Sequence, residues 1–230
     1  MNLIITCEHA GNQVPENYSH IFADVQDVLH SHQGWDPGAL EIARFVATEC
    51  SAPLFSCETT RLLIETNRSL NSHQLYSTYS RKLYETDHDF ILKQFYLPHR
   101  NAVEELISKV SKPALHLSIH SFTPVLNGHT RDVDIGILFD PDRKRESDFC
   151  KLLCDGLEQA LPLLVIKFNE PYKGTDDGFT TYLRTKFSDD EYLGIEIEVN
   201  QKYLGTETWE MIAMGLKEVL FEILYDEGQL

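Results

Sequence analysis

The sequence predicts an α/β fold in which a mostly parallel β-sheet is covered by helices on both faces. Short apolar runs alternate along the chain with longer segments of helical periodicity, as in successive strand–helix–strand units. The 230 residues are enough for one large domain with its own core. Since no linker, internal repeat or low-complexity segment interrupts them, we predict a single domain over residues 1–230.

The apolar runs give the expected strands. They cover residues 3–7, 52–56, 61–65, 114–120, 133–139, 163–168 and 192–199. The first long helix is expected to open at Asp36-Pro37, with Asp36 as its N-cap and Pro37 in its first turn. The remaining helices are predicted over residues 90–110, 147–160 and 209–225 from their apolar periodicity.

The composition excludes several classes of function. With 20 basic and 36 acidic residues the chain carries a formal charge of −16, which repels nucleic-acid phosphates and anionic membrane surfaces. No apolar run approaches the roughly 20 residues of a membrane-spanning helix, and the N-terminus lacks the basic region of a signal peptide. The five scattered cysteines favour reduced thiols. We therefore expect a cytoplasmic protein without nucleic-acid or membrane partners.

Three expected strands end in residues that can bind a metal or carry a proton. His9 follows the first strand, His120 ends the strand at 114–120, and Glu198 lies near the end of the last strand. Parallel strands place their carboxyl ends along one sheet edge, so these residues can meet despite their separation in sequence. Asp36, at the start of the first long helix, would lie at the same edge. Two histidines and a carboxylate with an open fourth position are the usual ligands of a catalytic zinc ion.

Each of these residues also has a purely structural interpretation. His9 could be a hydrogen-bonded turn residue, and His120 could be a core histidine like His116, which lies on the same face of its strand. Asp36 is well suited to be a plain N-cap. Two other acids could replace it as a ligand, Glu8 and Glu41.

Two carboxylates point to the same side of the last strand, Glu196 and Glu198. Carboxylates inside a buried strand are costly unless they have a function. Glu198, which is nearer the strand end, is the candidate general base, whereas Glu196 could orient a ligand or pair with an arginine. Nucleophilic catalysis is disfavoured because the chain contains no Gly-x-Ser-x-Gly motif and no cysteine in a recognisable activating setting.

Two arginines bracket the expected strand at 61–65. Arg68 follows its carboxyl end and is the better candidate to clamp a substrate carboxylate in bidentate fashion. The alternative for Arg68 is a surface salt bridge to Glu65 or Asp87. Further candidate substrate contacts are Arg61, Asn12 and Ser121.

A series of short motifs spans nearly the whole chain. They are Cys7–Asn12 followed by Val14-Pro15, His32 with Gly34–Ala39, Thr60–Ser69, Pro98-His99, Ile119–Phe122 and Glu196–Gln201. In this order they resemble the N-formylglutamate amidohydrolase family. Several motifs in one order are far more specific than any single one.

The resemblance implies the three-layer, zinc-peptidase-like α/β fold of carboxypeptidases and N-acetylmuramoyl-alanine amidases. By analogy with those amidases, which have a glutamate where this chain has Asp36, a zinc ion would be held by His9, Asp36 and His120. Glu198 would then be the base, and Arg68 would hold a carboxylate. The implied reaction cleaves the carbon–nitrogen bond of a small anionic N-acyl amino acid, such as N-formyl-L-glutamate, to formate and L-glutamate.

Two positions depart from the family pattern. The last strand continues as Asn200-Gln201-Lys202, where the family often has Arg-Gln-Asp, and Ser118 stands where the family often has an acidic residue. These differences indicate a divergent member with a different acyl-amino acid or amide substrate. The alternative functions are a zinc peptidase or N-acetylmuramoyl-alanine-type amidase, and a metal- or ligand-binding relative without catalysis. An intact base at Glu198 speaks against the last of these.

Overall fold

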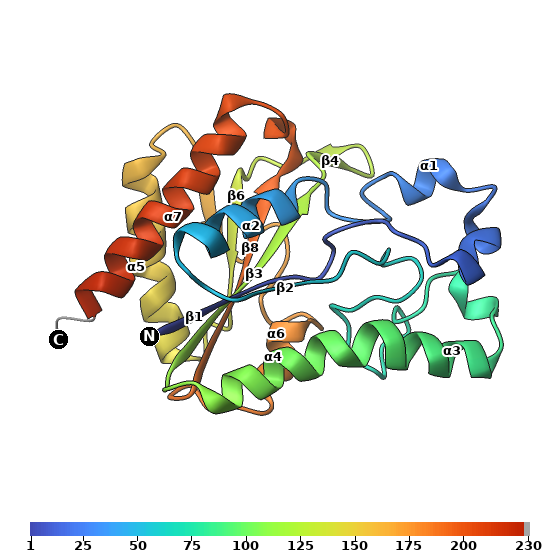
Figure 1. Cartoon of the computed structure of the whole chain (residues 1–230). Helices are drawn as coiled ribbons and strands as arrows, with labels where there is room; N and C mark the ends of the chain where they lie inside the picture. The colour runs from blue at the N-terminus through green and yellow to red at the C-terminus, as the bar shows by residue number, and fades with distance from the viewer. Residues whose placement is uncertain (228–230) are drawn as a thin grey trace.

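A six-stranded sheet lies between two layers of helices in the computed structural model, which describes residues 1–227 (Figure 1). The predicted three-layer α/β fold is confirmed; the last three residues of the predicted domain lie outside the described residues. In sheet order the strands are β2 (Leu54–Ser56), β1 (Asn2–Cys7), β3 (Ala114–Phe122), β8 (Tyr192–Asn200), β6 (Ile135–Leu138) and β7 (Ile166–Phe168). The first four are parallel, whereas β6 runs antiparallel to β8 and pairs in parallel with β7.

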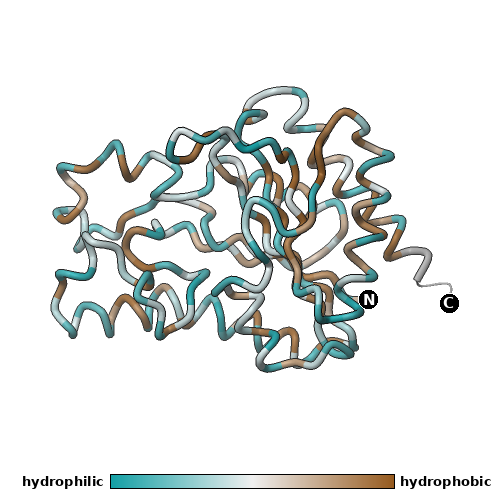
Figure 2. Tube along the Cα trace, turned by 180° about the vertical axis from the view of Figure 1, so that it is seen from behind, coloured by the Kyte–Doolittle hydropathy of each residue, from teal (hydrophilic) through white to brown (hydrophobic). Residues whose placement is uncertain are grey.

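Helices cover both faces of this sheet. One face packs against α2 (Ala39–Glu49), α5 (Lys144–Ala160) and α7 (Glu207–Glu227), and the other against α4 (Leu97–Lys109) and α6 (Phe179–Arg184) (Figure 1). Every residue of β3 and β8 is buried, because strands covered on both faces have no solvent side. Figure 2 shows the hydrophobic residues gathered along the strands and their covering helices.

A second apolar cluster lies beside the sheet, at the end where α1 and α3 are seen in Figure 1. It is formed by η1 (Glu16–Phe22), α1 (Gln26–Leu29), α3 (Glu85–Ile91) and the π-helical turn η3 (Leu92–Tyr96), which runs on into α4. The short η2 (Ser80–Lys82) lies between Tyr79 and Leu83, which pack against this cluster. The prediction of a strand at 61–65 is wrong. Those residues form turns, and Leu63 and Ile64 are fully buried in this cluster instead of pairing in the sheet.

The start of α2 also differs from the prediction. Gly38, with φ 82°, occupies the N-cap position, so Asp36 is not the cap. A Cβ atom on Gly38 would lie 2.4 Å from the Trp209 ring, and glycine alone fits both the positive φ and the close contact. The carboxylate of Asp36 is thereby left for other contacts.

A short hairpin after β3 was not predicted. It consists of β4 (Val125–Leu126) and β5 (His129–Thr130), joined by Asn127-Gly128, both with positive φ. Asn-Gly is a strong signal for such a two-residue turn. Along the chain, η4 (Gln201–Tyr203) follows β8 directly. Among residues 1–227, no helix combines the length and apolar character needed to cross a membrane.

Candidate active site

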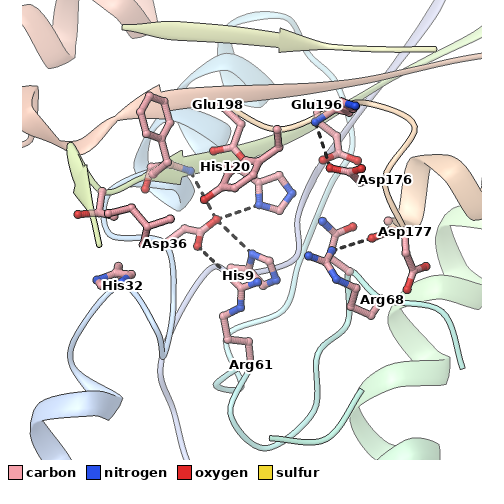
Figure 3. Close-up of a pocket in the computed structure, with 18 residues that line it drawn as sticks. His9, His32, Asp36, Arg61, Arg68, His120, Asp176, Asp177, Glu196 and Glu198 are labelled. Atoms are coloured by element: carbon pink, nitrogen blue, oxygen red, sulfur yellow. Dashed lines mark hydrogen bonds and ion pairs between the residues drawn. The ribbon is translucent and has the colours of Figure 1, made fainter. Parts of the chain in front are cut away.

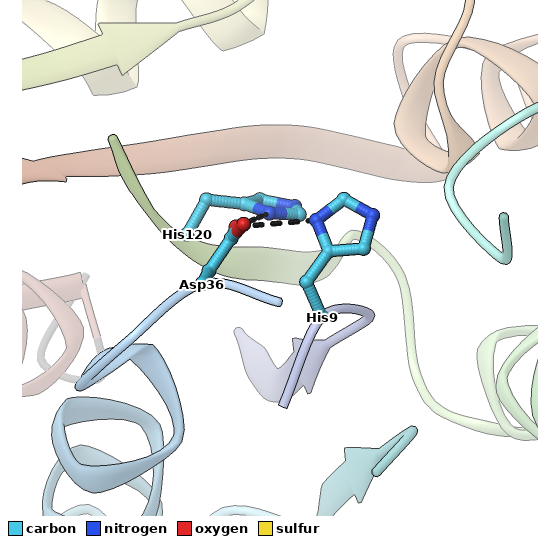
Figure 4. A group of neighbouring side chains, drawn as sticks. All are labelled: His9, Asp36 and His120. Carbon is cyan, nitrogen blue, oxygen red and sulfur yellow. Dashed lines mark hydrogen bonds and ion pairs between the residues drawn. The ribbon is translucent and has the colours of Figure 1, made fainter. Parts of the chain in front are cut away.

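The three predicted metal ligands converge at one carboxylate oxygen. Oδ2 of Asp36 lies 3.1 Å from Nδ1 of His9 and 2.9 Å from Nδ1 of His120 (Figure 4). All three side chains are buried, and the centroids of the two imidazole rings are 4.9 Å apart. One ligand atom from each residue lies within 4.8 Å of the others, which is close enough for a single metal ion to contact all three.

The sheet places these residues together. Strands β1 and β3 are paired in register from Asn2 with Ala114 to Thr6 with Ser118, so the turn after β1 carries His9 beside His120. The backbone N–H of Asp36 donates to the His9 carbonyl over 3.0 Å, which fastens the segment before α2 to that turn. The hydroxyl of Ser121 donates to the Pro37 carbonyl over 2.8 Å and holds the same segment against the end of β3.

Each histidine contacts a second carboxylate through its other ring nitrogen. Nε2 of His9 lies 2.5 Å from Oε1 of Glu65, and Nε2 of His120 lies 3.2 Å from Oε2 of Glu8 and 2.8 Å from the Ser118 hydroxyl. An ionised carboxylate only accepts hydrogen bonds, so without a metal ion each ring can donate Nε2–H to the acid behind it and Nδ1–H to Asp36. With a metal ion on the Asp36 side, the Nε2–H tautomer would leave the Nδ1 lone pairs for the ion. A carboxylate behind each histidine is the usual support of a metal ligand.

The alternative ligands lie elsewhere. Glu8 is behind His120, where its Oε2 also accepts from the Ser118 hydroxyl over 2.5 Å. Ser118, which stands where the family often has an acidic residue, thus links the carboxylate of Glu8 to the proposed metal ligand His120. Glu41 is exposed on α2. Sequence reasoning did not single out Glu65, although it lies within the motif Thr60–Ser69.

The electrostatics of the group also fit a cation. Burial raises the pKa of Asp36 and Glu65, but their contacts with His9 and Arg61 outweigh it and hold both pKa values well below the usual range. Burial lowers the pKa of His120, yet hydrogen bonds to Asp36 and Glu8 leave it well above the usual value. In the metal-free protein, protons occupy positions at which a metal ion would be bound.

Glu198 lies beside the three predicted ligands, because it is the β8 residue paired with His120 of β3. Its Oε2 is buried and has no hydrogen-bond partner among residues 1–227. Burial, with the nearby charges of Asp36 and Glu196, raises the pKa of Glu198 to about 8. The nitrogen and oxygen donors and this orphaned oxygen together fit a zinc ion with an adjacent proton acceptor.

The two predicted arginines differ in their partners. Arg61 donates from Nε to Glu65 over 2.7 Å and lies 3.2 Å from Oδ1 of Asp36, so its charge is balanced by two acids of the site. Arg68 donates to the Asp177 carbonyl over 2.7 Å and to the Gln74 side chain over 3.2 Å. Within residues 1–227 Arg68 makes no ion pair, and its expected alternative, a salt bridge to Glu65 or Asp87, is not formed.

These groups surround a cavity of about 170 Å³ (Figure 3). It is lined by His9, His32, Asp36, Arg61, Asn67, Arg68, His120, Ser121, Phe122, Thr123, Leu126, Tyr172, Lys173, Asp176, Asp177, Gly178, Glu196 and Glu198. Ser121 therefore lies at the cavity, and its predicted contact with substrate stays a prediction. Asn12 is not among the lining residues, and its amide donates to the Leu29 carbonyl over 3.2 Å. The loop residues 172–178 were missed because a polar loop has no periodicity that would mark it.

Comparisons with known proteins agree with the geometry. The family model described as N-formylglutamate amidohydrolase matches residues 1–204. A crystal structure of a gene product from Agrobacterium tumefaciens is 30% identical, with a TM-score of 0.83, covering 99% of this chain and 92% of that one. No curated protein matches the chain.

Two solved structures are more distant. The CwlD amidase from Clostridioides difficile, determined with the GerS lipoprotein, is 14% identical with a TM-score of 0.45, covering 98% of this chain and 99% of that one. A metallo-carboxypeptidase from Burkholderia cenocepacia is 10% identical with a TM-score of 0.40, covering 97% of this chain and 58% of that one.

Proposed function

Because the chain belongs to the N-formylglutamate amidohydrolase family, whose members hydrolyse amide bonds, we propose that it is a zinc-dependent hydrolase of small N-acyl amino acids. N-Formyl-L-glutamate, which would give formate and L-glutamate, is the first substrate to test. The observation that carries the proposal is the convergence of His9, Asp36 and His120 on one buried oxygen beside the unpartnered carboxylate of Glu198.

The proposed ligands are His9 through Nδ1, Asp36 through its carboxylate and His120 through Nδ1. A zinc ion bound there would polarise the scissile carbonyl and lower the pKa of water. Glu65 and Glu8 accept hydrogen bonds from the Nε2–H groups behind the two histidines and keep both rings oriented.

Glu198 is the proposed proton carrier. Its carboxylate takes a proton from the water that attacks the acyl carbon and passes it to the leaving nitrogen. A group that first accepts and then donates a proton works best with a pKa near the working pH, and burial moves the pKa of Glu198 in that direction. Arg68 lies at the cavity without an ion pair in the described chain and binds the substrate carboxylate.

Two further functions remain as alternatives, a zinc peptidase or cell-wall-type amidase and a metal- or ligand-binding relative without catalysis. A buried Glu198 with a free oxygen favours the hydrolase, because a binding protein gains nothing from that unsatisfied carboxylate. A cytoplasmic location, in which all five free cysteines stay reduced, is part of the proposal.

The test combines metal analysis with a deformylation assay. The protein is expressed with added zinc, and its zinc content and hydrolysis of N-formyl amino acids are measured for the wild type, Glu198→Gln and Glu210→Gln. Glu210 is an exposed glutamate on α7 and serves as the matched control. Glu198→Gln should keep its zinc and lose activity by about 10²–10⁴-fold. A wild type that takes up no zinc, or a Glu198→Gln variant as active as the wild type, contradicts the mechanism.

A further inference from the structure

The cavity has an apolar wall made of one buried and two partly exposed residues. Phe122 ends β3, Leu126 lies on β4 of the hairpin, and Tyr172 lies in the loop after β7. Leu126 is 37% exposed and Tyr172 41% exposed, and both line the cavity. Large apolar side chains at the mouth of a cavity, beside a few polar groups, are typical of a site that receives an apolar part of a ligand.

This wall is held in place by Arg131. Its Nη1 donates to the Tyr172 hydroxyl over 3.0 Å, and its guanidinium lies 5.4 Å from the Phe122 ring centroid and 5.0 Å from that of Tyr172. One arginine therefore joins the end of β3 to the loop at 171–178. The aromatic part of the wall is thus built into the structure.

The charged part of the lining offers little to a second carboxylate. Arg61 is neutralised by Asp36 and Glu65, which leaves Arg68 as the half-buried cation of the lining without an ion pair in residues 1–227. Lys173, the other cation of the lining that forms no ion pair with a described residue, is exposed, and water screens its charge.

Acidic groups line the cavity near Arg68. Figure 3 shows Glu196 and Asp176 on the same side of the cavity as Arg68. Glu196 is only 9% exposed, one of its oxygens accepts from the Thr180 hydroxyl over 2.6 Å, and no cation pairs with it in the described chain. A second substrate carboxylate would be repelled by these acids at close range.

We propose that the site prefers N-acyl amino acids with a single carboxylate and an apolar side chain over those with an acidic side chain. The α-carboxylate binds Arg68, and the side chain packs against Phe122, Leu126 and Tyr172. This inference rests on the proposed hydrolase function and defines its substrate class.

The hairpin offers a matched pair of variants. Val125 and Leu126 are neighbours on β4 and both are exposed, at 48% and 37%, but only Leu126 lines the cavity. Leu126→Asn removes apolar surface from the proposed binding wall, whereas Val125→Asn makes a comparable change outside it. Any effect of the hairpin on folding should be similar in the two variants.

The experiment measures kcat/KM of the zinc-loaded protein for N-formyl-L-leucine, N-formyl-L-glutamine and N-formyl-L-glutamate. Formyl-leucine should exceed formyl-glutamate by about tenfold or more, which is the scale on which a hydrophobic pocket discriminates. Leu126→Asn should lower the leucine-to-glutamate ratio about tenfold, and Val125→Asn should not change it. Calorimetric dissociation constants of the same compounds on Glu198→Gln should follow the same order without turnover.

Each other outcome is decisive. A preference for formyl-glutamate, removed by Lys173→Met, would show that Lys173 holds a second carboxylate and would overturn the inference while leaving the hydrolase intact. Equal effects of Leu126→Asn and Val125→Asn would overturn the apolar wall. If none of the compounds is hydrolysed or bound, the proposed function itself fails.

Discussion

The two sides of the cavity are built in different ways. On one side His9 and His120 are buried at the ends of β1 and β3, and Asp36 is buried just before α2. Every imidazole nitrogen of the two histidines has a hydroxyl or carboxylate partner. Elsewhere in the lining, Arg68, Leu126 and Tyr172 lie on turns, a hairpin and a loop, and they are partly exposed. The sheet edge fixes the groups that need a single geometry, whereas the loops contribute the groups that select the substrate.

The largest effect is expected from replacing Asp36, the carboxylate that both histidines contact. Asp36→Asn keeps the shape but removes the charge that faces both histidines and Arg61. We expect zinc content near zero and activity lower by about 10³-fold or more, because a ligand lost from a three-residue site leaves the ion weakly held. Metal analysis after dialysis and the deformylation assay measure both effects.

Asp24→Asn is the control for this change, since Asp24 is exposed and does not line the cavity. An Asp36→Asn protein that retains stoichiometric zinc would show that the metal is bound by other residues. The buried group at the sheet edge would then have only a structural role, and it would no longer differ in function from the rest of the lining.

A smaller effect is expected from the carboxylates behind the ligands. Glu65→Gln keeps a hydrogen-bond acceptor for His9 Nε2 but removes the charge that raises the basicity of Nδ1. Zinc affinity should fall about 10–100-fold, as for other supporting partners of metal ligands. Competition with a chelator measures it, and the control is Glu58→Gln, at a partly exposed glutamate paired with Arg44. Equal affinities for both variants would contradict a supporting role for Glu65.

The same contrast explains what could be predicted from the sequence. The ends of β1, β3 and β8 were recognisable because each apolar run stops at a polar residue that a buried strand would otherwise avoid. The strand at 61–65 was predicted wrongly because Leu62, Leu63 and Ile64 also fit a buried turn, and only the second apolar cluster decides between the two. Asp36 was mistaken for the N-cap because the contact of Gly38 with Trp209 is tertiary.

A change in pH should affect the metal-free protein through Glu198. Its pKa is raised to about 8 in the folded state, whereas an exposed glutamate titrates near 4.3. Between these values the folded state holds a proton that the unfolded state has lost, so stability falls as the pH rises. The raised pKa of His120 acts in the same direction above its usual value.

Glu198→Gln removes the Glu198 part of this dependence. In urea unfolding of the metal-free proteins, the variant should match the wild type near pH 5 and be more stable by on the order of 4 kcal/mol at pH 8. Parallel stability curves from pH 5 to pH 8 would show that Glu198 titrates normally. Its carboxylate would then be better solvated than the buried, unpartnered Oε2 indicates.

The smallest effect is expected at Asn12, whose predicted contact with substrate stays a prediction. Its amide joins the turn after β1 to the end of α1 through the Leu29 carbonyl. Asn12→Ala should therefore lower the free energy of unfolding by about 1 kcal/mol, the net worth of one such hydrogen bond, and change kcat/KM by less than about twofold. Gln26→Ala removes a similar amide-to-carbonyl bond, to Phe22, and is the control. A tenfold rise in KM for Asn12→Ala with unchanged stability would instead place Asn12 on the substrate, and the turn after β1 would then serve both sides of the cavity.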